Sequence, residues 1–163
     1  MSGPARLIAI LLLLGVSNAA PIILQKLLGS RFAAPLDAGL RLPDGERAFG
    51  DAKTVRGVAV SLVATALAAA ALGVGLGVGF ALAAASMTGD LASSFAKRRL
   101  HLPVHAQAFG LDQIPEALLP LLLLRDALRL RWLDVAALLL LFIAAELVLS
   151  RILFRLRIRD RPY

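Results

Sequence analysis

The apolar residues of the chain fall into long runs separated by polar segments, a pattern typical of helices that span a membrane. A helix needs about 20 largely apolar residues to cross the hydrocarbon core. Segments 7–28 and 133–154 meet that requirement. Segment 114–130 is weaker, because its apolar centre is short and prolines and charged residues interrupt it. We predict one membrane span in each of these three segments.

The beginning of the first span also fits a secretory signal peptide, which would be removed from the mature protein. The apolar run 7–14 would form its centre, and the small residues at 17–19 would precede the cleavage site. The apolar character resumes at 22–24, beyond that site. This continuation favours a membrane span.

The longest uncharged stretch lies between Arg56 and Asp90 and holds 33 residues. A single straight helix of that length would measure about 50 Å, well beyond the roughly 30 Å hydrocarbon core. Glycines at alternate positions from Gly73 to Gly79 weaken a helix at its middle. We therefore predict two short spans, 57–72 and 74–89, joined by a tight turn. The expected fold is an all-α integral membrane protein: one membrane domain over 1–163, about five transmembrane helices, and polar loops at 29–56 and 90–113.

The basic residues are distributed unevenly between the two sides of such a five-span protein. Fourteen of the eighteen Lys and Arg residues fall in segments 26–56 and 90–113 or at the C-terminus. The opposite side carries Arg6, Arg125, Arg129 and Arg131. Cytoplasmic loops carry the excess of basic residues in membrane proteins. We therefore expect the N-terminus outside and both polar loops, with any site they form, on the cytoplasmic face of the cell or inner membrane.

Composition narrows the classes of function. The chain is 59% hydrophobic and only 18% charged, which excludes a disordered chain and an ordinary soluble enzyme. It has no cysteine, so disulfides, thiolate metal sites and a cysteine nucleophile are excluded. The net charge of +7 fits contact with anionic lipid headgroups. Few aromatic residues accompany the basic ones, so we expect the bilayer as a partner and no nucleic acid.

The first polar loop places three phosphate-binding residue types where the second predicted span begins. Lys53, Thr54 and Arg56 stand at a helix N-terminus, whose free N–H groups and positive dipole end suit a phosphate. Taken singly, Lys53 and Arg56 are more typical of membrane-surface anchors. A Walker A loop is excluded, because no glycine directly precedes Lys53 and no strand leads into it.

The second polar loop repeats this mixture of acidic and basic residues. If the third helix continues past the membrane, Asp90, Ser94 and Lys97 share one face. Carboxylate oxygens suit Mg²⁺, and the basic groups of 97–99 suit phosphates, although basic residues also snorkel at ordinary helix ends. Two such clusters on one side of the membrane favour a site. His101 and His105 have the spacing of helical metal ligands, but Pro103 lies between them and no third ligand is near, so a transition-metal site is not favoured.

Taken in order, these motifs resemble the CDP-archaeol synthases, a family similar to the phosphatidate cytidylyltransferases. The motifs are Asn18 with Pro21, Pro35-Leu-Asp-x-Gly39, Asp44-Gly, Gly50-x-x-Lys-Thr-x-Arg-Gly57, Gly89-Asp-x-x-x-Ser-Phe-x-Lys-Arg-Arg99 and Asp112-Gln113. They extend over nearly the whole chain. The resemblance implies five spans, dependence on Mg²⁺, and transfer of CMP from CTP to a membrane lipid phosphate. The products would be pyrophosphate and a CDP-activated lipid of the archaeol or the diacylglycerol type, for phospholipid biosynthesis.

Transfer of CMP from CTP to a lipid phosphate would give each candidate residue a role. Metal ligands would be Asp90 together with Asp37, Asp44 or Asp112. The triphosphate and the lipid phosphate would be held by the catalytic basic residues Lys53, Arg56, Lys97 and Arg98. The further substrate-binding residues would be Asn18, Thr54, Gly57, Ser94, Arg99 and Gln113, with hydrogen bonds from the hydroxyls of Thr54 and Ser94.

Two readings without catalysis remain open. A small membrane transporter would use Asn18, Glu116 and Glu146, because polar residues within a membrane are functional candidates. A lipid-binding scaffold would use the basic C-terminus but leaves the paired Asp/Lys clusters unexplained. A CDP-alcohol phosphotransferase is excluded, since the sequence after Asp44-Gly departs from the pattern of that family. The sequence leaves the oligomeric state open.

Overall fold

The structure, a computed structural model, describes residues 3–103, 108 and 110–155. Within these residues the chain forms five helices: α1 (Gly3–Leu28), α2 (Val55–Ala71), α3 (Leu76–Arg99), α4 (Gln113–Leu123) and α5 (Trp132–Arg155). The predicted all-helical architecture of five helices is confirmed. Three helical segments are long and apolar enough to cross a membrane, namely α1, α3 and residues 132–152 of α5. Helices α2 and α4 are apolar but shorter.

Two predicted boundaries differ from the observed helices. Helix α3 continues past 89 to Arg99, so the first part of the predicted loop 90–113 is helical. Hydropathy marks where a helix leaves the membrane, whereas Ala, Lys and Arg in this segment support further helical turns. Helix α4 ends at Leu123, well before residue 130. The chain after it turns back, and Arg129 takes a left-handed conformation (φ 50°) that a continuing helix would not allow.

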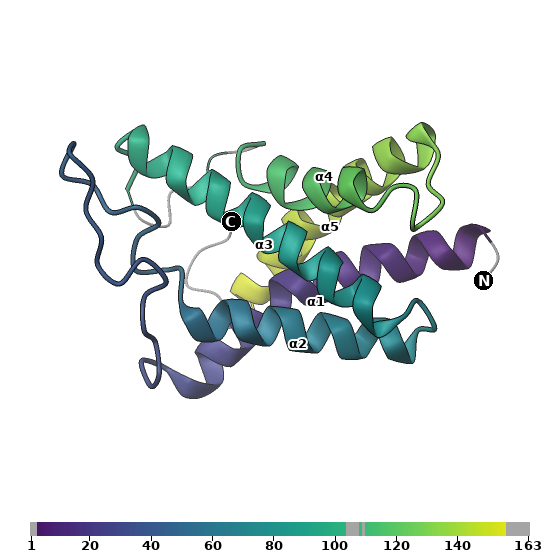
Figure 1. Cartoon of the computed structure of the whole chain (residues 1–163), viewed down its shortest axis with the longest axis horizontal. Coiled ribbons are helices and arrows are strands. Elements are labelled where there is room, and N and C mark those ends of the chain that lie inside the picture. Colours follow the sequence, from purple (N-terminus) through teal and green to yellow (C-terminus); the bar gives the residue numbers. More distant parts are fainter. Residues whose placement is uncertain (1–2, 104–107, 109, 156–163) are drawn as a thin grey trace.

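The helices pack around one apolar core. Helices α1, α2 and α3 lie against one another, α4 packs on α3, and α5 packs on α1 and α4 (Figure 1). The core is built mainly from aliphatic side chains, and all five helices contribute to it. Its most buried members are Ile10, Leu13 and Leu14 of α1, Leu82 of α3, Leu121 of α4 and Leu138 of α5.

Two glycines of α3 allow neighbouring helices to approach unusually closely. A Cβ atom on Gly79 would lie 2.3 Å from the Cβ of Ala69 in α2. A Cβ on Gly89 would lie 2.1 Å from the carbonyl oxygen of Pro115 in α4. Small residues at such crossings let helix backbones pack together in membranes. Helix α3 is therefore held between α2 and α4, which fixes the position of the residues that follow Gly89.

The connections gather at opposite ends of the bundle. The 29–54 loop and the C-terminal end of α3 lie at one end, called here the loop end (Figure 1). The N-terminus, the turn between α2 and α3, and the link between α4 and α5 lie at the other, called the turn end. Both predicted polar segments thus contribute to the same end of the molecule. That the loop end faces the cytoplasm stays a prediction.

Candidate functional site

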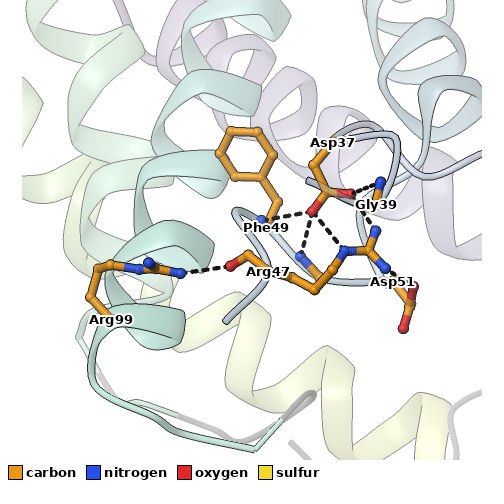
Figure 2. Close-up of polar contacts among 7 residues, drawn as sticks. Asp37, Gly39, Arg47, Phe49, Asp51 and Arg99 are labelled. Atoms are coloured by element: carbon orange, nitrogen blue, oxygen red, sulfur yellow. Dashed lines mark hydrogen bonds and ion pairs between the residues drawn. The ribbon is translucent and has the colours of Figure 1, made fainter. Parts of the chain in front are cut away.

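The 29–54 loop is organised around the carboxylate of Asp37, whose side chain is only 1% exposed. This carboxylate accepts hydrogen bonds from the backbone N–H groups of Gly39 (3.1 Å), Phe49 (3.0 Å) and Gly50 (3.2 Å). It also pairs with the guanidinium of Arg47, as Figure 2 shows. The arginine holds the pKa of Asp37 well below its usual range. The carboxylate is almost fully buried and its partners are three backbone N–H groups and one arginine of its own loop, so the contacts of Asp37 suit a structural role better than metal binding.

A second ion pair fastens this loop to the end of α3. One guanidinium nitrogen of Arg99 lies 2.7 Å from the carboxylate of Asp44. Another donates to the backbone oxygen of Arg47 at 2.8 Å (Figure 2). The same guanidinium lies 5.1 Å from the ring centroid of Phe95, a cation–π distance. Asp44 and Arg99, predicted as metal ligand and substrate binder, therefore bind each other.

Lys53 and Asp90 bring the two predicted clusters together across 37 positions of sequence. The ammonium group of Lys53 lies 2.6 Å from each oxygen of Asp90, and both side chains are 25% exposed. Lys53 reaches this position because α2 begins directly after it. Thr54 caps that helix, accepting a hydrogen bond from the N–H of Gly57 at 3.2 Å. The start of α2 therefore points a lysine at the first carboxylate after Gly89.

Lys97 and Asp112 form a similar pair between α3 and the start of α4. Their charged atoms lie 2.6 Å apart. Asp112 also accepts a hydrogen bond from the N–H of Ala108 (3.0 Å), and Gln113 accepts one from that of Gly110 (3.0 Å). The Asp112-Gln113 motif thus shapes the chain entering α4 while presenting one carboxylate oxygen to Lys97.

Glu116 is a functional candidate that the sequence analysis used only in the transporter reading. It is 7% exposed and lies one helical turn after Asp112. The close crossing at Gly89 brings α3 against its backbone N–H, and its carboxyl group interacts electrostatically with Asp90, Asp112 and Lys53. Asp112 and Glu116 are four positions apart, a spacing that puts two carboxyl groups on one face of a helix and could have identified Glu116 from the sequence. It was missed because Glu116 was counted as an interruption of a weak span.

The remaining predicted residues have distinct settings. Arg56 donates to the backbone oxygens of Gly29 and Arg31, tying α2 to the end of α1. Arg98 is 5% exposed and donates to the oxygen of Pro103 at 3.1 Å. Ser94 is buried on α3. Arg98 thus binds the chain that follows α3, Ser94 lies one helical turn before it, and Arg56 binds the backbone after α1.

Asn18 and Gly57 lie where α1 and α2 approach each other. A Cβ on Gly57 would meet the hydroxyl oxygen of Thr54 at 3.0 Å and Pro21 at 3.6 Å. One turn further along, the hydroxyls of Ser17 and Ser61 are hydrogen-bonded at 2.9 Å. The buried amide nitrogen of Asn18 has no hydrogen-bond partner among the described residues. It is therefore a donor available to a bound group.

The carboxylates of the described residues differ in how well they fit Mg²⁺. Within residues 3–103, 108 and 110–155, no three His, Cys, Asp or Glu side chains are grouped as a metal site. Mg²⁺ in nucleotide-dependent enzymes usually uses one or two carboxylates together with substrate phosphates and water. Asp90 and Asp112, near Glu116, fit that requirement; Asp37 and Asp44 do not. His105 and the C-terminal basic residues Arg157, Arg159 and Arg161 lie outside the described residues.

Comparison with known proteins identifies the family. The family model described as CarS-like, CDP-archaeol synthase, matches residues 68–163. The chain belongs to this family. A CDP-archaeol synthase of Pyrobaculum calidifontis is 36% identical over 112 residues, covering 66% of both chains. That of Aeropyrum pernix is 37% identical over 105 residues, covering 61% of this chain and 57% of the relative. The matches thus span less than two-thirds of either relative, 66% of the first and 57% of the second.

A solved structure extends the likeness to most of the chain. It is described as an intramembrane enzyme for archaeal membrane lipids biosynthesis. The TM-score is 0.63 at 34% identity, with 85% of this chain and 91% of the other covered. The predicted resemblance and the prediction of an all-α integral membrane protein are confirmed.

Proposed function

We propose that this chain transfers CMP from CTP to a membrane lipid phosphate, forming a CDP-activated lipid. The observation that carries the proposal is the convergence of Lys53–Asp90 and Lys97–Asp112 at the loop end of an intramembrane helical bundle. Family membership supports the same reaction. A transporter would be expected to arrange its polar groups along a path through the bundle, whereas these two pairs join the starts of α2 and α4 to the C-terminal half of α3.

The basic residues of the two pairs would bind the phosphates of the substrates. Each lysine is partly shielded from solvent and has a carboxylate partner within hydrogen-bond distance. A triphosphate competes for such lysines, because it presents several negative charges at once. Arg98 follows Lys97 on α3 and is buried, so its charge is little screened by solvent. The hydroxyls of Thr54 and Ser94 and the amides of Asn18 and Gln113 are the neutral donors assigned to this site.

The reaction requires two anions to meet. An oxygen of the lipid phosphate attacks the α-phosphorus of CTP, a new P–O bond forms, and the bond from the α-phosphorus to the bridging oxygen of pyrophosphate breaks. The protein contributes mainly by positioning the two phosphates and by neutralising charge as it shifts to the leaving pyrophosphate. Lys53 approaches from the start of α2 and Lys97 from α3, so the lysines can hold both reactants from different sides.

Asp90 and Asp112 are assigned to Mg²⁺, with Glu116 as a third carboxyl group nearby. A magnesium ion held there would supply positive charge that neutralises part of the charge of the phosphates. Asp37, Asp44, Arg56 and Arg99 are assigned to holding the 29–54 loop, from the contacts described above. This division replaces the broader set of metal and catalytic candidates drawn from the sequence.

The lipid acceptor is assigned to the bilayer, with its phosphate at the loop end and its tails among the helices. The matched relatives are CDP-archaeol synthases, which favours an ether-linked isoprenoid lipid over an ester-linked diglyceride. The excess of basic residues in 26–56, 90–113 and the C-terminal segment supports a cytoplasmic position for the loop end, with the N-terminus outside.

The experiment is CTP turnover by the purified protein in liposomes containing Mg²⁺. Unsaturated archaetidic acid and phosphatidate are supplied in parallel, and pyrophosphate and CDP-lipid are both measured. Product from either lipid supports the cytidylyltransferase, and the ratio of the rates gives the lipid class. Absence of product from both lipids, together with absence of CTP binding, would refute the proposal and favour the transporter.

A further inference from the structure

The turn end of the molecule carries two adjoining cavities lined by arginine. One, of about 230 Å³, is lined by Arg6, Arg129 and the residues Gly73, Val74, Val78, Ala127 and Leu128. The other, of about 260 Å³, shares Arg6 and adds Arg131, Asp134 and the first residues of α1. Three separate parts of the chain therefore meet around Arg6: the start of α1, the turn before α3, and the α4–α5 link.

The charges at this end are unevenly compensated. Arg125 pairs with Asp126 at 2.7 Å, and Arg131 pairs with Asp134 at 3.0 Å. Arg6 and Arg129 form no ion pair with any described residue, although Asp134 acts electrostatically on Arg6 from the adjoining cavity. The buried Nε of Arg6 has no hydrogen-bond partner in the described part of the chain. Within the cavity of Arg6 and Arg129, no acidic residue balances the two guanidinium groups.

The chemistry of this cavity selects its ligand. Guanidinium groups bind phosphate by paired hydrogen bonds, and leaving a buried donor unpaired is costly. At about 230 Å³ the cavity is smaller than the roughly 300–1,000 Å³ usual for drug-sized ligands. It therefore suits one phosphate group and not a nucleotide. Its apolar lining by Val74, Val78 and Leu128 suits the hydrocarbon attached to a lipid phosphate.

We propose that the cavity between Arg6 and Arg129 is a second anion site, which binds one phosphate group at the end of the molecule opposite the catalytic residues. The source of that phosphate is either the headgroup of an anionic lipid or free phosphate from solution. This site is independent of the proposed CTP reaction.

The single tryptophan of the chain provides a local reporter. Trp132 directly follows Arg131 and is 64% exposed. The full-length protein is reconstituted in phosphatidylcholine vesicles that contain a minor share of brominated lipid, either anionic phosphatidylglycerol or zwitterionic phosphatidylcholine. Quenching of Trp132 by each brominated lipid gives a ratio that measures the local preference for the anionic headgroup.

We expect Arg6→Gln and Arg129→Gln each to lower that ratio by up to about fivefold, from the typical attraction of one basic residue to an anionic membrane surface. Arg125→Gln is the matched control, because it removes the same charge from the same end without lining the cavity. The guanidinium of Arg125 lies 4.6 Å from the centroid of the Trp132 ring, so the variant changes the emission of Trp132 itself, and the ratio of the two quenchers cancels that change. Its ratio should stay close to that of the parent protein. Arg6→Lys, which keeps the charge, should retain most of the preference and guards against a folding defect.

Added inorganic phosphate distinguishes a lipid headgroup from free phosphate as the ligand of the cavity, and other outcomes would refute the site. Added inorganic phosphate that abolishes the preference, where chloride of equal ionic strength does not, assigns the site to free phosphate. A preference that survives inorganic phosphate assigns it to the lipid. No preference in the parent protein, together with no effect of inorganic phosphate on Trp132, overturns the proposal. Equal losses in the Arg6, Arg129 and Arg125 variants also overturn it, because diffuse surface charge would then explain the result.

Discussion

The two ends of the bundle use charge in different ways. At the loop end, Lys53 pairs with Asp90 and Arg99 with Asp44, each across a long separation in sequence. At the turn end, Arg125 pairs with the adjacent Asp126, and Arg131 pairs with Asp134 three positions on. Local pairs complete a helix end or a link. Long-range pairs hold separate segments in register, as binding two reactants would require.

The difference also concerns what surrounds each charge. Side chains of the loop-end pairs are mostly shielded, and Arg98 is buried. At the turn end, the side chain of Arg131 is 79% exposed. Shielded charges interact strongly and depend on their partners, whereas exposed pairs contribute little to stability. Substitutions at the loop end should therefore have larger effects than equivalent substitutions at the turn end.

The largest loss of CTP turnover is expected from Asp90→Asn. It removes the carboxylate that pairs with Lys53 and is assigned to the metal, so we expect CTP turnover to fall by at least about a hundredfold. Asp51→Asn is the matched control, since Asp51 lies on the same end, is 77% exposed and pairs only with Arg47 at the surface. Turnover of CTP into CDP-lipid is measured for both. Near-normal turnover in the Asp90 variant would remove Asp90 from the site.

The second prediction tests whether the helix crossing supports the loop-end site. In Gly89→Ala the new methyl group would lie 2.1 Å from the oxygen of Pro115, so α3 and α4 must separate. Overpacking of this kind typically costs about 1–3 kcal/mol. We expect a lower melting temperature and weaker turnover, because Asp90 and Glu116 flank the crossing.

Gly77→Ala is the control for that substitution, since it lies on the same helix with nothing within 4 Å of a new Cβ. Alanine favours a helix over glycine by up to about 1 kcal/mol, so this variant should melt at the same temperature or slightly higher. If the two variants behave alike, the crossing is looser than the structure indicates.

The helical architecture could be predicted from the sequence, whereas most of the side-chain contacts could not. Apolar runs and the glycine turn were sufficient for five helices, because span length and helix breaking are local properties. Helix α3 continues to Arg99 although Asp90–Arg99 is polar, so the apolar run indicated the span and not the end of the helix. The pairing of Lys53 with Asp90 depends on the crossing at Gly89 and on the cap at Thr54, which only the packed structure combines. For the same reason Asp37 and Asp44 could not be distinguished from Asp90 as metal candidates.

A smaller and local effect, on amide exchange in the 29–54 loop, is expected from substitution of Asp37. This substitution tests the structure of the loop apart from the reaction. Asp37→Asn should raise amide hydrogen exchange at Gly39, Phe49 and Gly50 by about tenfold, since hydrogen bonds to a charged group contribute about 1.5–3 kcal/mol. The depressed pKa of Asp37 means that its stabilising contribution is complete above about pH 4, its unfolded value, and is lost as the pH falls through the lower folded value.

The parent protein should therefore show faster exchange at these amides under strong acid, after correction for the intrinsic pH dependence of exchange, and the Asn variant should lack that additional step. Exchange at α5 serves as the internal reference, because α5 does not contact Asp37. An identical acid response in both proteins would show that another group orders the loop.

The smallest effect on CTP turnover is expected from Arg6→Gln, at the turn end. Arg6 lines only turn-end cavities, and at physiological salt exposed charges are screened beyond about 8 Å. We therefore expect CTP turnover to change by less than about twofold, while the anionic-lipid preference reported by Trp132 falls. Arg98→Gln, which removes the same charge at the loop end, should reduce turnover strongly and leave that preference unchanged. A large loss of turnover in the Arg6 variant, with the fold intact, would mean that α1 couples the two ends and that the turn-end cavities influence the reaction.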